Sequence, residues 1–257
     1  MLNLKKLVTG KISALRRNIL KFFVPEFFWP DHIVIENTKI KLRGEPYSFG
    51  IKYILKKGDY ELPERKLLRF CNFEGETIIE MGGSIGILTA ILANKVGNTG
   101  KVISVEASES ISAYSRSWLE KNHSVKIVTG FAFPVTEIAN QIHSIKFNQS
   151  GSSLEGKIEF NYSNKILNVN NSIYDIKKIS DLFNLKPTVL VVDIEGAEKI
   201  ILDQQPRFPP SIKLILIELH PQVYGEANQS EIIKRIIDEG FSIKKSEGIV
   251  FLFERSL

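Results

Sequence analysis

From residue 77 onward, short apolar runs alternate with segments of helical spacing, and this alternation narrows the folds open to the chain more than any other feature. Three of the runs, 77–81, 188–193 and 212–218, are apolar along almost their whole length. Strands buried on both faces of a parallel sheet have this composition, because helices cover the sheet on either side. The alternation therefore predicts an α/β fold, with helices on both faces of a mainly parallel sheet. The last segment, 241–254, has the pattern of a hairpin and predicts one antiparallel edge strand.

The positive charge of the chain is concentrated at its N-terminal end. The 257 residues carry a net charge of +5, and residues 1–25 contain six basic residues and no acidic one. The rest therefore holds 28 basic and 29 acidic residues, which leaves a charge of −1. A length of this order suits one domain with an extension. The single cysteine, Cys71, excludes an internal disulfide framework, and no apolar run has the length expected of a transmembrane helix.

The same N-terminal segment has the spacing of an amphipathic helix. Its apolar residues recur at steps of three and four, which places them on one face of a helix. We expect residues 1–30 to form a basic helical arm, for which three interpretations stay open. The helix packs on the body of the protein, or it lies on an anionic membrane surface through residues 1–25, or it is a mitochondrial transit peptide.

The main domain is expected to span residues 31–257. Its first part, 31–76, is interpreted as an N-terminal cap with a short hairpin at 33–43 and a helix at 61–73. Residues 147–175 interrupt the alternation of strands and helices, because they are rich in Ser, Asn and Gly. We interpret them as an insertion with a hairpin in GKIEFNYSNKILNV (156–169). The cap and the insertion are expected to shape a substrate pocket.

The strand at 77–81 leads directly into a glycine-rich loop, in the sequence TIIEMGGSIG (77–86). In open α/β sheets, ligands bind beyond the carboxyl ends of the strands, where this loop lies. The dinucleotide fingerprint would need glycine in place of Met81, and a P-loop would need Lys followed by Ser or Thr after Gly86. The loop matches neither motif, so it predicts a ligand other than a bound phosphate, or a tight turn without a ligand.

Two carboxylates near this loop favour a ligand with a ribose and a positive charge. Glu106 ends the second strand, 24 residues after Gly82, where nucleotide-binding α/β domains place an acidic residue on the ribose hydroxyls. Glu80 is a second acid at the end of the first strand. Two carboxylates without a cation make a poor phosphate site. S-adenosylmethionine has both a ribose and a sulfonium charge, and we expect Glu80 near its methionine end.

The residues from Glu80 to Gly86 resemble motif I of class I S-adenosylmethionine-dependent methyltransferases. More narrowly, the chain resembles the FkbM-type methyltransferases over residues 45–255. Four further stretches carry this resemblance, namely GDYELPE (58–64), VEASES (105–110), VVDIEGAE (191–198) and LIELH (216–220). The resemblance implies a Rossmann-like class I methyltransferase fold with a seven-stranded sheet. It also implies methyl transfer to a hydroxyl oxygen, often of a sugar.

The chain departs from the usual FkbM-type pattern at several positions. The family usually has Asp in place of Glu80, Ala-Asn in place of Gly83-Ser84, Pro in place of Ala107 and Lys in place of Val191. The Lys would belong to the catalytic pocket. Its absence leaves open a membrane-associated binding or scaffold protein with a degenerate methyltransferase site.

The resemblance implies contacts with S-adenosylmethionine from the glycine loop, the ends of the strands and the segment before the first strand. The expected cofactor-binding residues are Tyr60, Glu61, Glu80, Gly82, Gly83, Ser84, Gly86, Glu106, Ala107, Phe131, Ala132 and Asp193.

Polar side chains at the carboxyl ends of the later strands are the catalytic candidates. Asp193 and His220 each follow an apolar strand. Burial of a carboxylate costs free energy unless the group is paired, so a carboxylate at the end of a buried strand indicates a specific role. Asp193 is therefore our first choice as the base or the group that orients the substrate, and His220 is the second. Glu195 and Glu218 complete the catalytic set. We expect a metal-free site, although these four side chains have the ligand atoms for a divalent ion.

We therefore expect an S-adenosylmethionine-dependent O-methyltransferase that acts on a sugar hydroxyl of a glycan or glycolipid, in the cytoplasm and peripherally on the membrane. Nucleic-acid partners are disfavoured, because the body of the chain is not basic and DIEG stands where nucleobase methyltransferases have a Pro-Pro-aromatic motif. An RNA methyltransferase that uses the basic arm to bind phosphates is the other alternative.

Overall fold

The chain divides into two compact units, residues 1–62 and 63–257, and each is described by itself. Residues 1–25 of the arm predicted at 1–30 lie outside the described residues. The structure is a computed structural model that describes residues 26–45, 47–135, 144–149, 156–161, 172–203 and 208–256.

The first unit contains a hairpin and a helix. Its elements are η1 (Glu26–Phe28), β1 (His32–Ile35), β2 (Thr38–Lys41) and α2 (Phe49–Lys57). The two strands pair antiparallel, and Glu36 and Asn37 turn between them with φ of 47° and 62°. Turns with two residues of positive φ match the twist of a hairpin, and this confirms the hairpin predicted at 33–43. The side chain of Ser48 caps α2 by accepting the N–H of Ile51.

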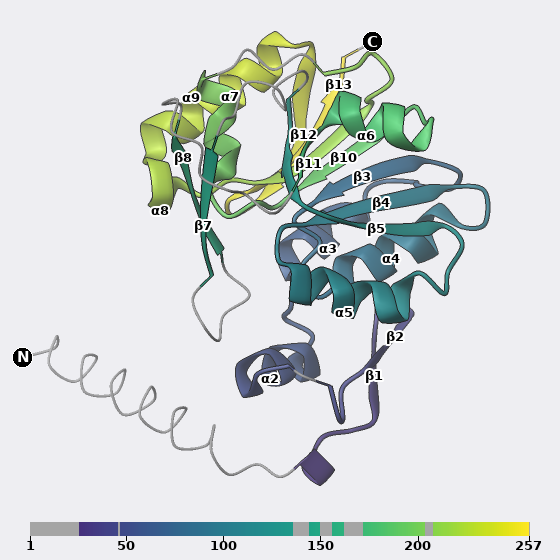
Figure 1. Ribbon diagram of the computed structural model, residues 1–257. Helices are drawn as coiled ribbons and strands as arrows, with labels where there is room; N and C mark the ends of the chain where they lie inside the picture. Colours follow the sequence, from purple (N-terminus) through teal and green to yellow (C-terminus); the bar gives the residue numbers. More distant parts are fainter. Residues whose placement is uncertain are drawn as a thin grey trace, which may run out of the picture. The chain divides into compact units, whose positions relative to one another are not determined.

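The second unit is built on a seven-stranded sheet with the order β12-β13-β11-β10-β3-β4-β5. The strands are β3 (Thr77–Met81), β4 (Lys101–Glu106), β5 (Val125–Thr129), β10 (Val189–Val192), β11 (Leu214–Glu218), β12 (Phe241–Glu247) and β13 (Val250–Arg255). Neighbours from β5 to β11 run parallel, and β13 runs antiparallel to both β11 and the outermost strand β12. The predicted Rossmann-like α/β fold is confirmed (Figure 1).

Helices cover both faces of this sheet (Figure 1). One face packs against α3 (Leu62–Leu68), α4 (Ile87–Val96) and α5 (Glu109–Leu119). The other packs against α6 (Ile176–Phe183), α7 (Ile200–Asp203) and α9 (Glu226–Asp238). Side chains alternate between the faces along each strand. Ile78 therefore joins the first layer and Ile79 the second.

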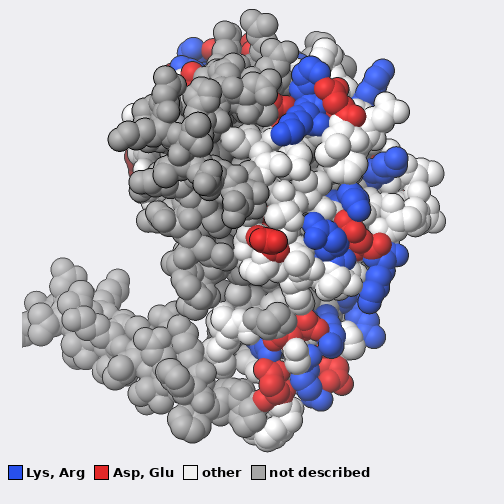
Figure 2. Space-filling view, viewed as in Figure 1, with Lys and Arg blue, Asp and Glu red and all other residues white. Residues whose placement is uncertain are grey.

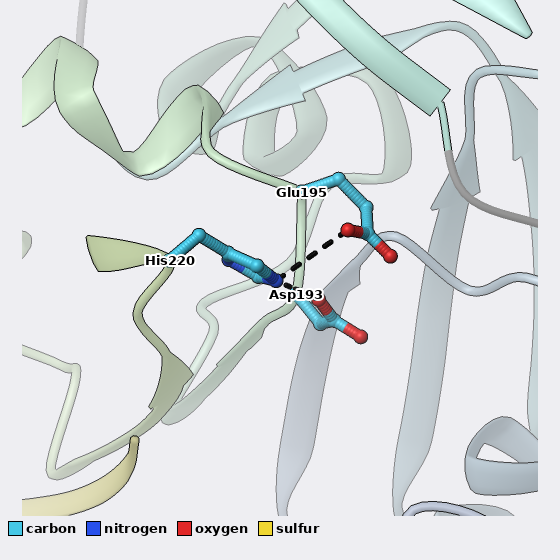
Figure 3. Close-up of side chains that lie close together, drawn as sticks. All are labelled: Asp193, Glu195 and His220. Carbon is cyan, nitrogen blue, oxygen red and sulfur yellow. Dashed lines mark ion pairs between the residues drawn. The ribbon is translucent and has the colours of Figure 1, made fainter. Parts of the chain in front are cut away.

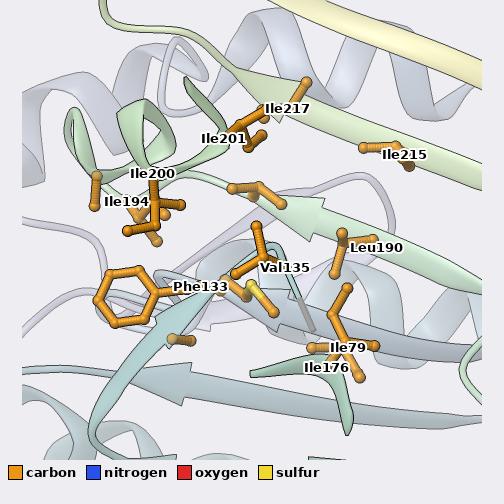
Figure 4. Close-up of a cluster of buried hydrophobic side chains, with 14 of the residues drawn as sticks. Ile79, Phe133, Val135, Ile176, Leu190, Ile194, Ile200, Ile201, Ile215 and Ile217 are labelled. Atoms are coloured by element: carbon orange, nitrogen blue, oxygen red, sulfur yellow. The ribbon is translucent and has the colours of Figure 1, made fainter. Parts of the chain in front are cut away.

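The core on the face of α6, α7 and α9 fixes where the central strands end. Figure 4 shows Ile79, Leu190 and Ile215 of three adjacent strands beside Ile176 of α6 and Ile200 of α7. Each is at most 1% exposed. Full burial of one such side chain contributes about 1.5–3 kcal/mol. The register of the strands, and so the position of the loops that follow them, is therefore strongly determined.

Two short strand pairs lie outside the main sheet. Strands β6 (Phe131–Phe133) and β9 (Ile173–Asp175) pair parallel, and β7 (Ser144–Gln149) and β8 (Gly156–Asn161) pair antiparallel. The first part of the hairpin predicted at 156–169 thus pairs with β7, which precedes it in the chain. Residues 162–169, the rest of that predicted hairpin, lie outside the described residues.

Candidate active site

The loop after β3 lies so close to the neighbouring strands that only glycine fits at its first two positions. Gly82 has a φ of 90°, and a Cβ atom there would lie 1.6 Å from the backbone oxygen of Asp193. A Cβ atom at Gly83 would lie 2.0 Å from Ser104 Oγ on β4. Gly86 then caps the N-terminus of α4. The glycines that were predicted to contact the cofactor therefore allow the loop to lie directly against the ends of β10 and β4.

Glu106, at the end of β4, binds this loop from the other side. Its two carboxylate oxygens accept hydrogen bonds from the backbone N–H of Ser84 at 2.9 Å and of Ser108 at 2.7 Å. Burial raises the pKa of Glu106, although the hydrogen bonds from Ser108 and Ser84 act in the opposite direction. A backbone hydrogen bond from Ala107 also reaches this carboxylate, which offers about four lone-pair sites in all. Glu106 can therefore hold the loop and still accept a hydrogen bond from a ribose.

Glu80, the second acid predicted at the cofactor, lies beneath the loop. Its side chain is 1% exposed and accepts a hydrogen bond from the Thr89 hydroxyl of α4. Its Oε1 atom has no hydrogen-bond partner among the described residues. Burial raises the pKa of Glu80 to about 7, against the hydrogen bonds from Ser104 and Thr89. Its expected place near the methionine end of the cofactor stays a prediction.

The buried carboxyl of Glu80 predicts a pH-dependent stability. Its pKa of about 7 in the folded chain exceeds the ordinary value of 4.5, so the folded state binds more protons than the unfolded state between these values. Stability is then lost as pH rises through this window, by about 3 kcal/mol in total. We expect Glu80→Gln to raise the free energy of unfolding at pH 8 and to change it little at pH 4.5, as measured by urea unfolding. An equal change at both pH values would contradict this.

The remaining predicted cofactor residues fall in two groups. Ala107 follows β4, and Phe131 and Ala132 are buried in β6. The N–H of Gly130 donates to the carbonyl oxygen of Glu106 at 2.9 Å, which brings β6 to the end of β4. Tyr60 and Glu61 belong to the first unit, and their contact with the cofactor stays a prediction.

The catalytic candidates Asp193, Glu195 and His220 meet at the carboxyl ends of β10 and β11 (Figure 3). His220 Nε2 lies 3.7 Å from Asp193 Oδ1 and 3.5 Å from Glu195 Oε2. The histidine side chain is 4% exposed, whereas those of Asp193 and Glu195 are 29% and 38% exposed. The cluster thus has a buried imidazole on one side and two partly exposed carboxylates on the other.

Glu198 holds the loop that carries this cluster. It is fully buried, and its Oε1 atom accepts the backbone N–H of Ile194 at 3.1 Å and of Gly196 at 3.3 Å. The same oxygen lies 3.2 Å from His220 Nδ1. The backbone N–H of His220 donates to the Tyr224 hydroxyl at 2.7 Å. The stretch DIEGAE therefore forms a loop closed by the Glu198 carboxylate, which also lies beside the imidazole of His220. The sequence pattern did not indicate this position for Glu198.

The titratable groups of this cluster are shifted by burial and by one another. Burial, and then the charges of Glu195 and Glu198, raise the pKa of Asp193 well above its ordinary value. Burial acts to lower the pKa of His220, but the hydrogen bond and charge of Glu198, with Glu218, outweigh it and raise this pKa. Negative charge from neighbouring carboxylates contributes to both shifts, whereas burial acts in opposite directions on the two pKa values. The cluster holds more negative charge than its own side chains neutralise.

Glu218, the fourth catalytic candidate, is paired with a residue that the sequence analysis did not select. Burial, the charges of Asp193 and Glu64, and a hydrogen bond with Glu64 raise the pKa of Glu218 to about 9. Glu64 comes from α3 and is 5% exposed. The stretch GDYELPE ends at Glu64, so the resemblance contained a signal for it.

The surface drawn in Figure 2 carries both signs of charge. Lys and Arg side chains lie next to Asp and Glu side chains over the described part of this face. Ion pairs such as Lys126–Glu120 and Lys177–Asp181 join side chains of opposite charge on the surface of the second unit. Among the described residues, no helix has the length and apolar character to cross a bilayer.

Comparison with protein families gives one match, over part of the chain. Residues 66–133 match the protein-L-isoaspartate(D-aspartate) O-methyltransferase family. This segment is shorter than half of the chain, and it contains the glycine loop and Glu106. The match supports a methyltransferase with S-adenosylmethionine as its cofactor. No curated protein sequence matches the chain.

Several solved structures are similar to this chain at low sequence identity. Methyltransferase FkbM from Methylobacillus flagellatus has 12% identity and a TM-score of 0.44, with 72% of this chain and 45% of that chain covered. Fibrillarin from Aeropyrum pernix, with natively bound S-adenosyl-L-methionine, has 12% identity and a TM-score of 0.43, with 79% and 74% covered. A SAM-dependent O-methyltransferase from Thermotoga maritima has 15% identity and a TM-score of 0.42, with 76% and 64% covered.

Proposed function

We propose that the protein transfers a methyl group from S-adenosylmethionine to a hydroxyl group, of a sugar in a glycan or glycolipid. The observation that carries this proposal is the contact between the glycine loop and the end of β10. Gly82 lies directly against the backbone oxygen of Asp193, so the loop adjoins the cluster of Asp193, Glu195 and His220. Methyl transfer requires a donor and an acceptor that are held side by side in a fixed orientation.

The donor sulfonium is already activated, so the protein has to orient the acceptor and manage its hydroxyl proton. We assign this task to Asp193 first and to His220 second, with Glu195 and Glu218 beside them. A well-placed group of this kind contributes about 10²- to 10⁴-fold in rate. The sugar acceptor and the FkbM type derive from the resemblance of the sequence motifs.

Isothermal titration calorimetry with S-adenosylhomocysteine tests the cofactor site. We expect the wild-type chain to bind this product, and Glu106→Gln to weaken binding by roughly 10- to 100-fold, because hydrogen bonds to a charged group are worth about 1.5–3 kcal/mol. Glu109→Gln is the matched control, since Glu109 is an exposed acid three residues further along. Binding of neither S-adenosylhomocysteine nor S-adenosylmethionine by the wild type would refute the proposal.

Two other candidate functions differ from the proposed one in the acceptor, and experiments on the acceptor distinguish them. An RNA methyltransferase would use the six basic residues of 1–25, and deletion of that segment would remove salt-sensitive RNA binding. A membrane-associated scaffold would bind the cofactor product without methylating a glycan extract, and the same deletion would remove its binding to anionic liposomes. Mass spectrometry of glycans from cells with and without the protein tests the preferred acceptor directly.

A further inference from the structure

We propose that Asp193, Glu195 and His220 bind one divalent transition-metal ion, of the class of Mn²⁺ or Zn²⁺. The sequence led us to expect a metal-free site, whereas the tertiary structure favours a site that binds a metal ion. One ligand atom of each side chain lies within 4.8 Å of the other two. The three side chains point toward a common centre (Figure 3).

The distances suit a shared ion better than direct hydrogen bonds. His220 Nε2 lies 3.7 Å from Asp193 Oδ1 and 3.5 Å from Glu195 Oε2, beyond the N–H···O range of about 2.7–3.2 Å. Two ligand atoms that each bind one ion at about 2.1 Å lie roughly 3.4 Å apart at a tetrahedral angle. Asp193 Oδ1 is also buried without a hydrogen-bond partner among the described residues.

A third carboxylate, that of Glu198, lies beside the other ring nitrogen of His220. Glu198 Oε1 lies 3.2 Å from His220 Nδ1 and is itself held by two backbone N–H groups of the DIEGAE loop. A carboxylate beside Nδ1 favours the tautomer with its proton on Nδ1, which leaves the Nε2 lone pair for a metal. Metal-binding histidines in proteins have this carboxylate–histidine arrangement.

The backbone at Glu195 decides which substitution can test the site. Glu195 has a φ of 54°, in the left-handed region that favours glycine. Gly196 follows with a φ of 99°. These two residues turn the loop that carries the Glu195 carboxylate toward His220 Nε2.

The chemistry of the ligands indicates the ion and its role. One imidazole and two carboxylates suit Mn²⁺ or Zn²⁺ better than Mg²⁺ or Ca²⁺, which prefer oxygen ligands alone. The partly exposed carboxylates leave a side of the ion open to a ligand from solvent. There the ion would hold an acceptor oxygen and lower the pKa of its hydroxyl. That role rests on the proposed function, whereas binding of the ion does not.

Calorimetric titration of the full chain with Mn²⁺, without cofactor, tests the site. We expect one saturable site, and at least 10-fold weaker binding in Glu195→Gly. Glycine adopts positive φ freely, so this variant should keep its melting temperature and its loss of affinity cannot reflect unfolding. Glu198→Gln should weaken binding by about 10- to 100-fold. The control Glu226→Gln, an exposed acid of α9, should bind like the wild type.

Absence of saturable Mn²⁺ binding, or equal affinity in the wild type and Glu195→Gly, would overturn the metal site. A parallel titration with S-adenosylhomocysteine in EDTA separates this inference from the proposed function. A chain that binds S-adenosylhomocysteine but no Mn²⁺ lacks only the metal site. A chain that binds Mn²⁺ through these residues but no S-adenosylhomocysteine keeps the metal site and loses the proposed function.

Discussion

Gly82→Ala is expected to lower the free energy of unfolding by about 3–5 kcal/mol, from strain at positive φ and from forced overpacking together. The added Cβ atom would lie 1.6 Å from the backbone oxygen of Asp193 and 2.7 Å from its carbonyl carbon. Both are backbone atoms at the end of a central strand, so they cannot turn aside as a flexible side chain can. Urea unfolding measures the loss, and calorimetry should show that binding of S-adenosylhomocysteine is lost with it.

Gly248→Ala is the matched control for this substitution. Gly248 also has a positive φ, of 62°, but a Cβ atom there meets nothing within 4 Å. Its substitution should cost about 1 kcal/mol, from the left-handed conformation alone. If the two variants were equally stable, the close approach of the loop to Asp193 would be wrong.

Asp193→Asn is expected to lower turnover by about 10²- to 10⁴-fold, the usual contribution of a group that manages a proton in the reaction. Burial, and then the charges of Glu195 and Glu198, raise the pKa of Asp193, so a neutral amide at this position avoids both costs and should not unfold the chain. The release of S-adenosylhomocysteine in the presence of a glycan extract measures turnover. Calorimetry should show retained binding of the cofactor product.

Asp238→Asn is the control for turnover, because Asp238 is a surface carboxylate of α9 paired with Lys234. It should change turnover by less than about twofold, as expected of a surface substitution away from the site. Full turnover in Asp193→Asn, with the cofactor product bound, would remove Asp193 from catalysis and leave His220 as the candidate.

Much of the fold was open to prediction because it depends on local patterns. The apolar runs of β3, β10 and β11 indicated central strands, and all three lie in the middle of the sheet. The hairpin of the insertion was predicted at 156–169, whereas β8 pairs with β7, which precedes it. Local composition indicates that a hairpin is present but not which two segments pair. The pairing depends on contacts between the strands on either side of the turn.

The candidate site was predictable where it lies at strand ends. Asp193 and His220 come together because parallel strands end at the same edge of a sheet. Glu64 was missed because it enters the cluster from α3, about 130 residues before Asp193 in the chain. The packing of a helix on the sheet decides which strand ends its side chains approach. The sequence of the helix alone does not indicate this.

Short stretches of the sequence were enough to predict the α/β alternation, the glycine loop and the acids at the strand ends, because strand burial, backbone freedom and charge are properties of a few adjacent residues. The role of each acid, in contrast, depends on the folded chain. Glu80 lies buried beneath the loop, Glu106 holds it by two backbone N–H groups, and Glu198 lies beside the imidazole of His220. The pKa and the partners of a carboxylate depend on burial and on groups brought near by folding, and these arise only when the strands and helices pack together.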